Sequence, residues 1–268
     1  MKTDIRLIAL DLDGTLLDSQ KRLSARNEAV LQECISRGIY IVPCTGRIWG
    51  GVPEFLRSLP GIRYAITTNG AIVEDVAEHR ILDERKLGCA QAVDILELAG
   101  KFHTMYDAYV DGCAYGEKRF MEHMDDYAIP DTIQTMILQT RQEVPDVKER
   151  IRMLNLPVEK INYFFGDQQE RARARRALQE RGDVIVSSSL DNNLEINAPV
   201  FNYSNIASAG KRLFCNYLVV KIPDKQQKSE LELYGYQEVG TAGSYALYRL
   251  GDSADAVRNP ILDRWDWR

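Results

Sequence analysis

The chain has 268 residues, of which 45% are apolar and 27% are charged, and its net charge is −5. These values are ordinary for a globular protein long enough to form one large domain or two smaller ones. The acidic balance gives no sign of a nucleic-acid-binding surface, and no run approaches the roughly 18 apolar residues of a membrane span. The N-terminus lacks a signal-peptide pattern. Five scattered cysteines without CxxC spacing favour a cytoplasmic protein with reduced thiols.

An apolar run near the N-terminus ends at two aspartates. Residues 5–10 predict a short, fully buried strand, and Asp11 and Asp13 follow at its carboxyl end. In open α/β sheets this is the end where ligands bind. A spacing of two in extended chain lets both carboxylates face one side, where they repel unless a cation or a shared proton lies between them. A hard divalent ion such as Mg²⁺ takes oxygen ligands and suits phosphate substrates.

The next segment repeats the pattern at the same sheet edge. A helix is predicted over 20–38, with a serine N-cap and a terminal glycine, and a second buried strand over 39–44. Strand, helix and strand form a right-handed βαβ unit, so Thr45 is expected at the same edge as Asp11. The Thr45 hydroxyl and the backbone N–H groups around Gly46 can bind phosphate oxygens. A threonine here also suits a helix N-cap, and the two roles can coexist.

The middle of the chain changes character. A third strand over 64–68 runs into an Asn-Gly turn and a small hairpin. The segments predicted beyond it are a helix over 90–101, a strand pair over 104–115, short helices and polar loops over 118–155, a strand over 160–165 and a charged helix over 170–181. An inserted α/β module, residues 84–190, therefore separates residues 1–83 from 191–268. The expected fold is an α/β core with a Rossmann-like, mostly parallel sheet, plus this module.

Several of these motifs are shared with one known family. The string DLDGTLL at residues 11–17 resembles the first signature of the haloacid dehalogenase-like (HAD) superfamily. Thr-Gly-Arg after the second strand, Asn-Gly-Ala before the module and Leu-Glu-Ile at residues 194–196 are similar to motifs of the Cof-type subclass IIB phosphatases. The resemblance covers residues 5–199 and implies that the inserted module is the cap of that subclass.

The resemblance also implies chemical roles. Asp11 would be the nucleophile that takes the phosphoryl group, and Asp13 the general acid/base. Thr45 and Gly46 would bind the phosphate. Asp11 and Asp13 would bind Mg²⁺ together with a distal acid, for which Asp252 is the candidate. The substrate implied is a small phosphorylated metabolite, such as a sugar phosphate or a phosphorylated cofactor.

Beyond Pro199 the match fails. Tyr203 stands near the place where the family has its third-signature lysine. The segment ending in Gly-Asp-Ser-Ala-Asp imitates the fourth signature, but only 13 residues follow its last aspartate. The candidates for the missing roles are Lys211 or Lys228 for the lysine and Asp252 or Asp255 for the distal acid.

Three accounts of this tail stay open. It is divergent but functional, or it results from a shifted reading frame or a truncation, or it marks a non-catalytic family member with a replaced tail. The expected function is a Mg²⁺-dependent phosphatase that works through an aspartyl-phosphate, with weak or absent turnover in this chain. The expected oligomeric state is a monomer or a homodimer. The alternatives are a phosphomutase and a catalytically inactive phosphate-ligand binding or regulatory protein.

Overall fold

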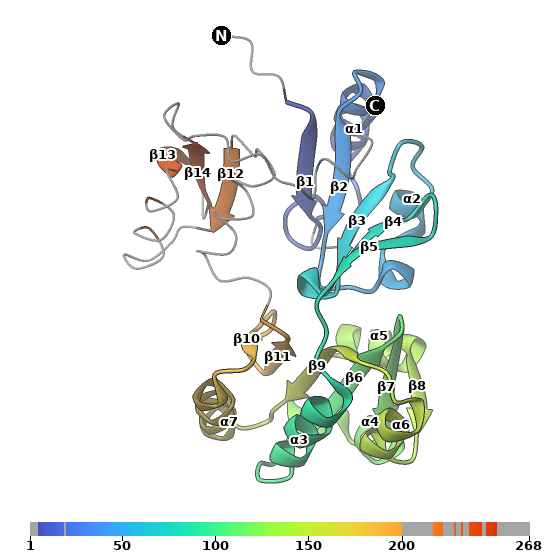
Figure 1. Ribbon diagram of the computed structural model, residues 1–268, viewed down its shortest axis with the longest axis vertical. Coiled ribbons are helices and arrows are strands. Elements are labelled where there is room, and N and C mark those ends of the chain that lie inside the picture. Colours follow the sequence, from blue (N-terminus) through green and yellow to red (C-terminus); the bar gives the residue numbers. More distant parts are fainter. Residues whose placement is uncertain are drawn as a thin grey trace. The chain divides into compact units, whose positions relative to one another are not determined.

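The computed structural model describes two compact units of the chain. These units are Met1–Val200 and Phe201–Arg268. The described residues are 5–18, 20–199, 217–221, 228, 232, 236–242 and 245–250. The first unit holds two separate sheets, which Figure 1 shows joined by the chain that leaves β5 and enters α3.

The first sheet has the order β1-β2-β3-β4-β5. Its strands are β1 (Leu7–Asp11), β2 (Tyr40–Cys44), β3 (Tyr64–Thr67), β4 (Ile72–Asp75) and β5 (Arg80–Glu84). β1, β2 and β3 pair in parallel, whereas β3, β4 and β5 pair antiparallel. The prediction of a mostly parallel sheet is therefore wrong. The chain passes from β3 to β4 through the short turn η2 (Thr68–Gly70), and strands joined this tightly pair antiparallel.

The βαβ unit forms as the sequence predicts. α1 (Ala25–Ser36) begins at Ser24, whose hydroxyl accepts the Asn27 N–H at 3.1 Å. The segment after Thr45 forms two short helices, η1 (Trp49–Gly51) and α2 (Glu54–Arg57). The apolar side chains that pack α1 and α2 onto this sheet are Leu12, Leu16, Leu17, Leu31, Ile41, Val52, Leu56, Leu59 and Ile62.

β1 is less buried than the sequence predicts. Leu7 is 40% exposed, and Ala9 and Asp11 are exposed as well, so the prediction of a fully buried strand is wrong. The reason lies in the sheet order, because β1 is an edge strand among the described strands and pairs only with β2. An edge strand keeps one row of backbone groups, and part of its side-chain surface, without a neighbouring strand.

The second sheet has the order β10-β11-β9-β6-β7-β8 and is antiparallel except between β7 and β8. Its strands are β6 (Met105–Val110), β7 (Cys113–Glu117), β8 (Arg141–Val144), β9 (Val158–Phe164), β10 (Ile185–Ser187) and β11 (Asn193–Asn197). The accompanying helices are α3 (Cys89–Ala99), α4 (Lys118–Met121), η3 (Met124–Tyr127), α5 (Asp131–Thr140), α6 (Val147–Leu154) and α7 (Gln168–Arg181). The sequence did not predict β8, because Arg-Gln-Glu-Val has no apolar alternation.

The two faces of the second sheet differ in chemistry. One face is apolar and packs with α3, α6 and α7; its strand residues include Ala108, Val110, Ile161, Tyr163, Leu194 and Ile196. Alternate positions point to the other face. They are polar and nevertheless buried: Asp107, Tyr109, Lys160, Asn162, Glu195 and Asn197. Buried polar groups require hydrogen-bond partners. We therefore expect this polar face to lie against polar groups of another part of the first unit.

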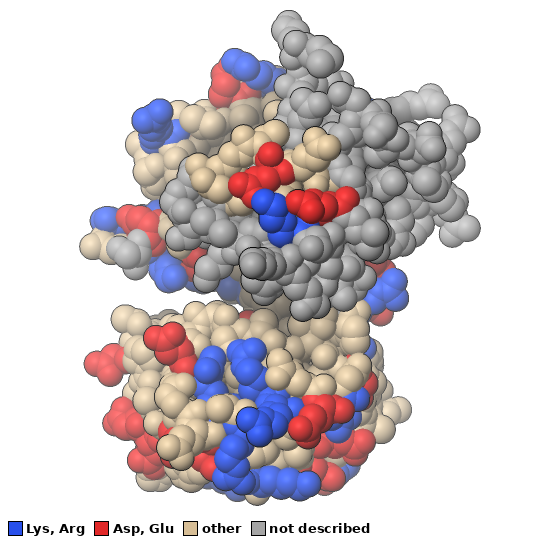
Figure 2. All heavy atoms as spheres, turned by 90° about the vertical axis from the view of Figure 1, so that its left-hand side faces the viewer, with Lys and Arg blue, Asp and Glu red and all other residues tan. Residues whose placement is uncertain are grey.

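The basic helix α7 lies on the outside of this sheet. Figure 2 shows Lys and Arg side chains gathered on that side of the molecule. Arg171 and Arg175 both donate to the hydroxyl of Ser188, and Arg173 pairs with Glu170. These arginines therefore pair with other groups of the chain.

Gly166, in the turn after β9, is the place where the second sheet tolerates least added volume. A Cβ at this position would lie 2.2 Å from the backbone carbonyl oxygen of Asp126. We expect Gly166→Ala to lower the free energy of unfolding by about 1–3 kcal/mol, the usual cost of overpacking. The measurement is urea unfolding followed by circular dichroism. Gly50→Ala is the matched control, because nothing lies within 4 Å of a Cβ there. Equal unfolding midpoints for the two variants would contradict the prediction.

The described strands of the second unit form a small antiparallel sheet. Its strands are β12 (Tyr217–Lys221), β13 (Tyr236–Ala242) and β14 (Tyr245–Leu250), in the order β12-β14-β13. Lys228 pairs with Glu238 at 3.1 Å. Tyr203, Lys211, Asp252 and Asp255 lie outside the described residues. Among the helices that the structure does describe, none is both long and apolar enough to cross a membrane.

Candidate active site

Asp11 lies beside the loop that follows β2. The parallel register of β1 and β2 places Asp11 opposite Cys44, one residue before Thr45. The Asp11 side chain accepts a hydrogen bond from the Thr15 hydroxyl at 2.7 Å. Asp11 is exposed, whereas Thr45 is buried. An accessible carboxylate thus stands next to a buried hydroxyl at the carboxyl edge of the sheet, where ligands bind in such folds.

Asp13 is held by two cations. Arg47 donates from Nε to Oδ2 at 2.8 Å and from Nη2 to Oδ1 at 2.7 Å, and Lys21 Nζ lies 2.8 Å from Oδ1. Partial burial raises the pKa of Asp13, but the hydrogen bonds from Arg47 and Lys21 outweigh it and lower the pKa to about 2. Asp13 is therefore a carboxylate at neutral pH, and its bidentate partner connects it to the loop after β2.

The loop of residues 45–47 is held through its backbone carbonyls. The Thr45 carbonyl accepts the Asn69 N–H at 3.1 Å, and the Arg47 carbonyl accepts the Thr68 N–H at 2.9 Å. The Gly46 carbonyl accepts Lys160 Nζ at 2.8 Å. The Arg47 N–H in turn donates to the Thr45 hydroxyl oxygen at 3.2 Å. The turn after β3 and the second sheet thus fix the loop together.

The turn after β3 has an unusual backbone. Thr68, Asn69 and Gly70 have φ angles of 52°, 59° and 90°. Such angles are uncommon for a β-branched residue such as threonine, and local strain of this kind concentrates at functional sites. The Thr68 hydroxyl is buried without a hydrogen-bond partner among the described residues. The positive φ angles of Asn69 and Gly70 agree with the Asn-Gly turn that the sequence predicts.

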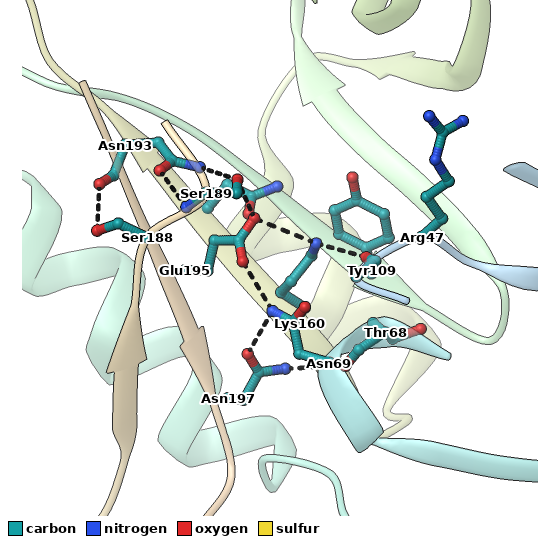
Figure 3. A network of polar contacts seen from close by, with 12 residues as sticks. Arg47, Thr68, Asn69, Tyr109, Lys160, Ser188, Ser189, Asn193, Glu195 and Asn197 are labelled. Atoms are coloured by element: carbon teal, nitrogen blue, oxygen red, sulfur yellow. Dashed lines mark hydrogen bonds and ion pairs between the residues drawn. The ribbon is translucent and has the colours of Figure 1, made fainter. Parts of the chain in front are cut away.

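A buried polar network connects this turn to the second sheet (Figure 3). Asn69 Nδ2 donates to Glu195 Oε2 at 2.8 Å and to Asn197 Oδ1 at 3.2 Å. Glu195 also accepts from the Ser189 hydroxyl at 2.9 Å and pairs with Lys160 at 3.7 Å. Asn197 donates to the Thr68 carbonyl at 3.2 Å. The polar face of the second sheet thus finds its partners at the edge of the first sheet.

The donors expected for Mg²⁺ fit the ion only in part. Among the described residues, no group of three His, Cys, Asp or Glu side chains is arranged to hold a metal. Asp11 keeps Oδ1 without a hydrogen bond in the described part of the chain and offers the hard oxygen that Mg²⁺ prefers. Arg47 and Lys21 occupy both Asp13 oxygens, so that carboxylate does not suit a cation as it is placed. Asp252, the third expected ligand, lies outside the described residues.

Several side chains around the loop were not predicted from the sequence. Arg47, Lys21 and Lys160 are the cations that the fold brings to it. Arg47 carried a signal, since it follows Thr45 by two residues. Lys160 carried none, because the residue it contacts is 114 positions earlier. Tyr109 also adjoins the network, since its ring centre lies 4.8 Å from Lys160 Nζ.

Cys44 is not poised to act as a nucleophile. Burial, reinforced by the negative charge of Asp11, raises the pKa of its thiol to about 12. Because the thiolate is the reactive form, the thiol is inert at neutral pH.

The ion pairs of Asp13 predict a pH-dependent stability. Since the pKa is lower in the folded chain than its ordinary value of 3.8, the stabilisation is complete above that value and is lost as the pH falls towards about 2. We expect Asp13→Asn to cost about 1 kcal/mol at neutral pH, a figure reduced for solvent screening. Urea unfolding in EDTA at several pH values should show the gap from the parent chain closing between pH 4 and pH 2. A gap that is constant across this range would contradict the prediction.

Comparison with known proteins identifies the family. The family model for haloacid dehalogenase-like hydrolases matches residues 8–205. This match covers more than half of the chain, and the chain therefore belongs to that family.

Individual relatives are more distant. Phosphatase YwpJ of Bacillus subtilis (strain 168) is 31% identical over 121 residues, which are 45% of this chain and 42% of that protein. The 5-amino-6-(5-phospho-D-ribitylamino)uracil phosphatase YcsE of the same organism is 35% identical over 104 residues, 38% of this chain and 41% of that protein. The matched parts thus span 42% and 41% of these two curated relatives.

The fold has counterparts among solved structures. That of the HAD subclass IIB sugar phosphatase BT4131 superposes with a TM-score of 0.59 at 15% identity, over 78% of this chain and 76% of that one. At this identity the likeness concerns the fold alone. The two-sheet arrangement of the first unit is thus shared with that sugar phosphatase.

Proposed function

We propose that this protein is a Mg²⁺-dependent phosphatase that hydrolyses a small phosphorylated metabolite, a sugar phosphate or a phosphorylated cofactor, through an aspartyl-phosphate. The observation that carries the proposal is the register of β1 and β2, which sets the exposed Asp11 carboxylate beside the Thr45–Arg47 loop. Family membership supports the reaction class, and the relatives that act on phosphorylated compounds support the substrate class. In this proposal residues 1–83 with 191–268 form the core and residues 84–190 the cap.

The residues present suggest how the first step proceeds. The Thr45 hydroxyl and the Gly46 N–H bind phosphoryl oxygens at the loop. An oxygen of Asp11 attacks phosphorus in line, and the P–O bond to the leaving alcohol breaks. Mg²⁺, held by Asp11, would neutralise charge on the phosphoryl oxygens when bound. The second step returns the Asp11 carboxylate when water attacks the phosphoryl group.

Asp13 is the proton carrier in this scheme. It can act as a general acid only if its ion pairs with Arg47 and Lys21 are weakened. A general acid works best when its pKa is close to the working pH, and Arg47 and Lys21 hold Asp13 well below that. Transfer of Arg47 from Asp13 to a substrate phosphate would raise the pKa of Asp13. The bidentate geometry of a guanidinium suits phosphate and carboxylate equally well.

The sequence after Pro199 lowers the turnover that we expect for this reaction. A lysine beside the nucleophile would stabilise the charge that builds up in the transition state, and a distal acid would complete the metal site. The family motifs for both are missing after Pro199, and Lys228 pairs with Glu238 within the second unit. We therefore expect weak turnover.

Two alternative functions can be told apart from a phosphatase by what happens to the phosphorylated ligand. A phosphomutase would use the same Asp11 and Asp13 but would move phosphate within a sugar. An inactive member would bind a phosphorylated ligand without consuming it.

The experiment that tests the proposal incubates the full chain and Mg²⁺ with p-nitrophenyl phosphate and a panel of sugar phosphates and phosphorylated cofactors. Released phosphate and ³¹P NMR spectra of the products are followed. Slow phosphate release is the expected result. Isomerised sugar phosphate identifies a mutase, and a bound but unchanged ligand identifies a binding protein; either result overturns the proposal.

A further inference from the structure

The ammonium group of Lys160 is where the second sheet reaches the loop after β2. The Lys160 side chain is 5% exposed, and Nζ donates to the Gly46 carbonyl at 2.8 Å. Figure 3 shows it between Glu195 and Tyr109, with Arg47 on the far side of the Tyr109 ring. Burying an ammonium group costs free energy unless its hydrogens are donated to acceptors. The hydrogen bond to the Gly46 carbonyl is therefore needed to keep Lys160 buried.

The Gly46 carbonyl controls the direction of the next N–H. In a planar trans peptide the carbonyl and the following N–H point in opposite directions. A hydrogen bond that fixes the Gly46 carbonyl therefore also fixes the Arg47 N–H. That N–H donates to the Thr45 hydroxyl oxygen at 3.2 Å. Because the hydroxyl accepts this bond, its own hydrogen stays available for a separate acceptor.

The loop has little room to adjust by itself. A Cβ added to Gly46 would lie 2.5 Å from Asn69 Oδ1, so the loop packs tightly against the turn after β3. Asn69 is in turn fixed by Glu195, which also pairs with Lys160. A shift of Lys160 would therefore be transmitted to the loop both through Gly46 and through Glu195.

We propose that Lys160 is a positioning residue for phosphate binding: it holds the peptide between Gly46 and Arg47 so that the Thr45 hydroxyl is directed at the phosphoryl group. This inference rests on the proposed function, since it takes Thr45 as a phosphate ligand. It assigns to the second sheet a direct part in organising the phosphate site.

The test is a double-mutant cycle with inorganic phosphate as the probe. Isothermal titration calorimetry in Mg²⁺ buffer compares the full-length parent chain, Lys160→Met, Thr45→Val and the double variant. We expect each single change to weaken phosphate binding about tenfold, the worth of one hydrogen bond to a charged group. The double variant should be no more than about twofold weaker than Thr45→Val, because the two side chains act through one contact. Lys118→Met is the control, as that side chain is 61% exposed, and it should leave the affinity unchanged.

The outcomes separate this inference from the proposed function. Losses that multiply to about a hundredfold in the double variant would overturn the positioning role, and so would an unchanged affinity in Lys160→Met while Thr45→Val weakens binding. If Thr45→Val also leaves the affinity unchanged, the phosphate site itself is wrong.

Lys160→Arg keeps a donor and should restore most of the affinity. A purely structural defect would reduce the fraction of binding-competent protein without changing the affinity of that fraction. If Lys160→Met does not fold, Lys160→Ala, which also lacks a donor, takes its place in the cycle.

Discussion

Replacing Asp11 by Asn is expected to remove nearly all of the phosphatase activity that we propose for this chain. The amide keeps the size of the side chain and its acceptor for the Thr15 hydroxyl, but it cannot form the acyl-phosphate bond. Loss of a catalytic nucleophile typically costs about 10⁴-fold or more in turnover, with only the contribution of binding left. Because we expect the parent chain to be slow, the sharper measurement is covalent labelling. Parent chain mixed with a ³²P-phosphate ester and quenched in acid should retain label, and Asp11→Asn should retain none.

Two controls make the Asp11 result specific. Asp94→Asn changes an exposed carboxylate on α3 and should label like the parent chain. Inorganic phosphate should still bind to Asp11→Asn, because the loop after β2 is unchanged. Label on Asp11→Asn equal to that on the parent chain would place the nucleophile elsewhere.

The sequence predicted local features of this fold better than distant contacts. The Ser24 cap of α1, the hairpin after β3 and the strand pair of β6 and β7 follow from short-range rules and are present in the structure. The direction of β4 and β5 was also determined locally, by the short turn that precedes β4. The prediction of a mostly parallel sheet failed because it extended the βαβ rule past that turn.

The contacts of the site depend on residues that are far apart in the chain. Asp11, Asp13 and Thr45 could be selected because each follows a predicted strand. The pairing of Asp13 with Arg47, or of Lys160 with Gly46, depends on side-chain directions that no periodicity encodes. The exposure of β1 could not be predicted either, since burial of a strand is a property of its neighbours in the sheet.

Replacing Asp107 by Leu is expected to produce the largest loss of stability in the second sheet. Asp107 is fully buried and pairs with Arg141, itself 4% exposed, at 2.9 Å. Its other oxygen accepts from Asn162 Nδ2 at 2.6 Å. Removing one partner leaves a buried guanidinium without its counter-charge, which costs about 3–5 kcal/mol. Urea unfolding followed by circular dichroism should show the loss, and the exposed carboxylate variant Asp94→Leu should stay within about 0.5 kcal/mol of the parent chain.

The double variant Asp107→Leu with Arg141→Met decides whether charge is the cause. Arg141 also donates to the Tyr109 hydroxyl at 2.6 Å, so the pair orients the ring that lies against Lys160. If the unpaired charge dominates, removing Arg141 as well should recover stability relative to Asp107→Leu alone, by about 1 kcal/mol or more. If the double variant is less stable than the single one, the contact with Tyr109 is the larger contribution and the charge argument is wrong. In either case Tyr109 loses its hydrogen bond from Arg141. Phosphate affinity measured on the double variant therefore reports how far the polar face of the second sheet supports the loop after β2.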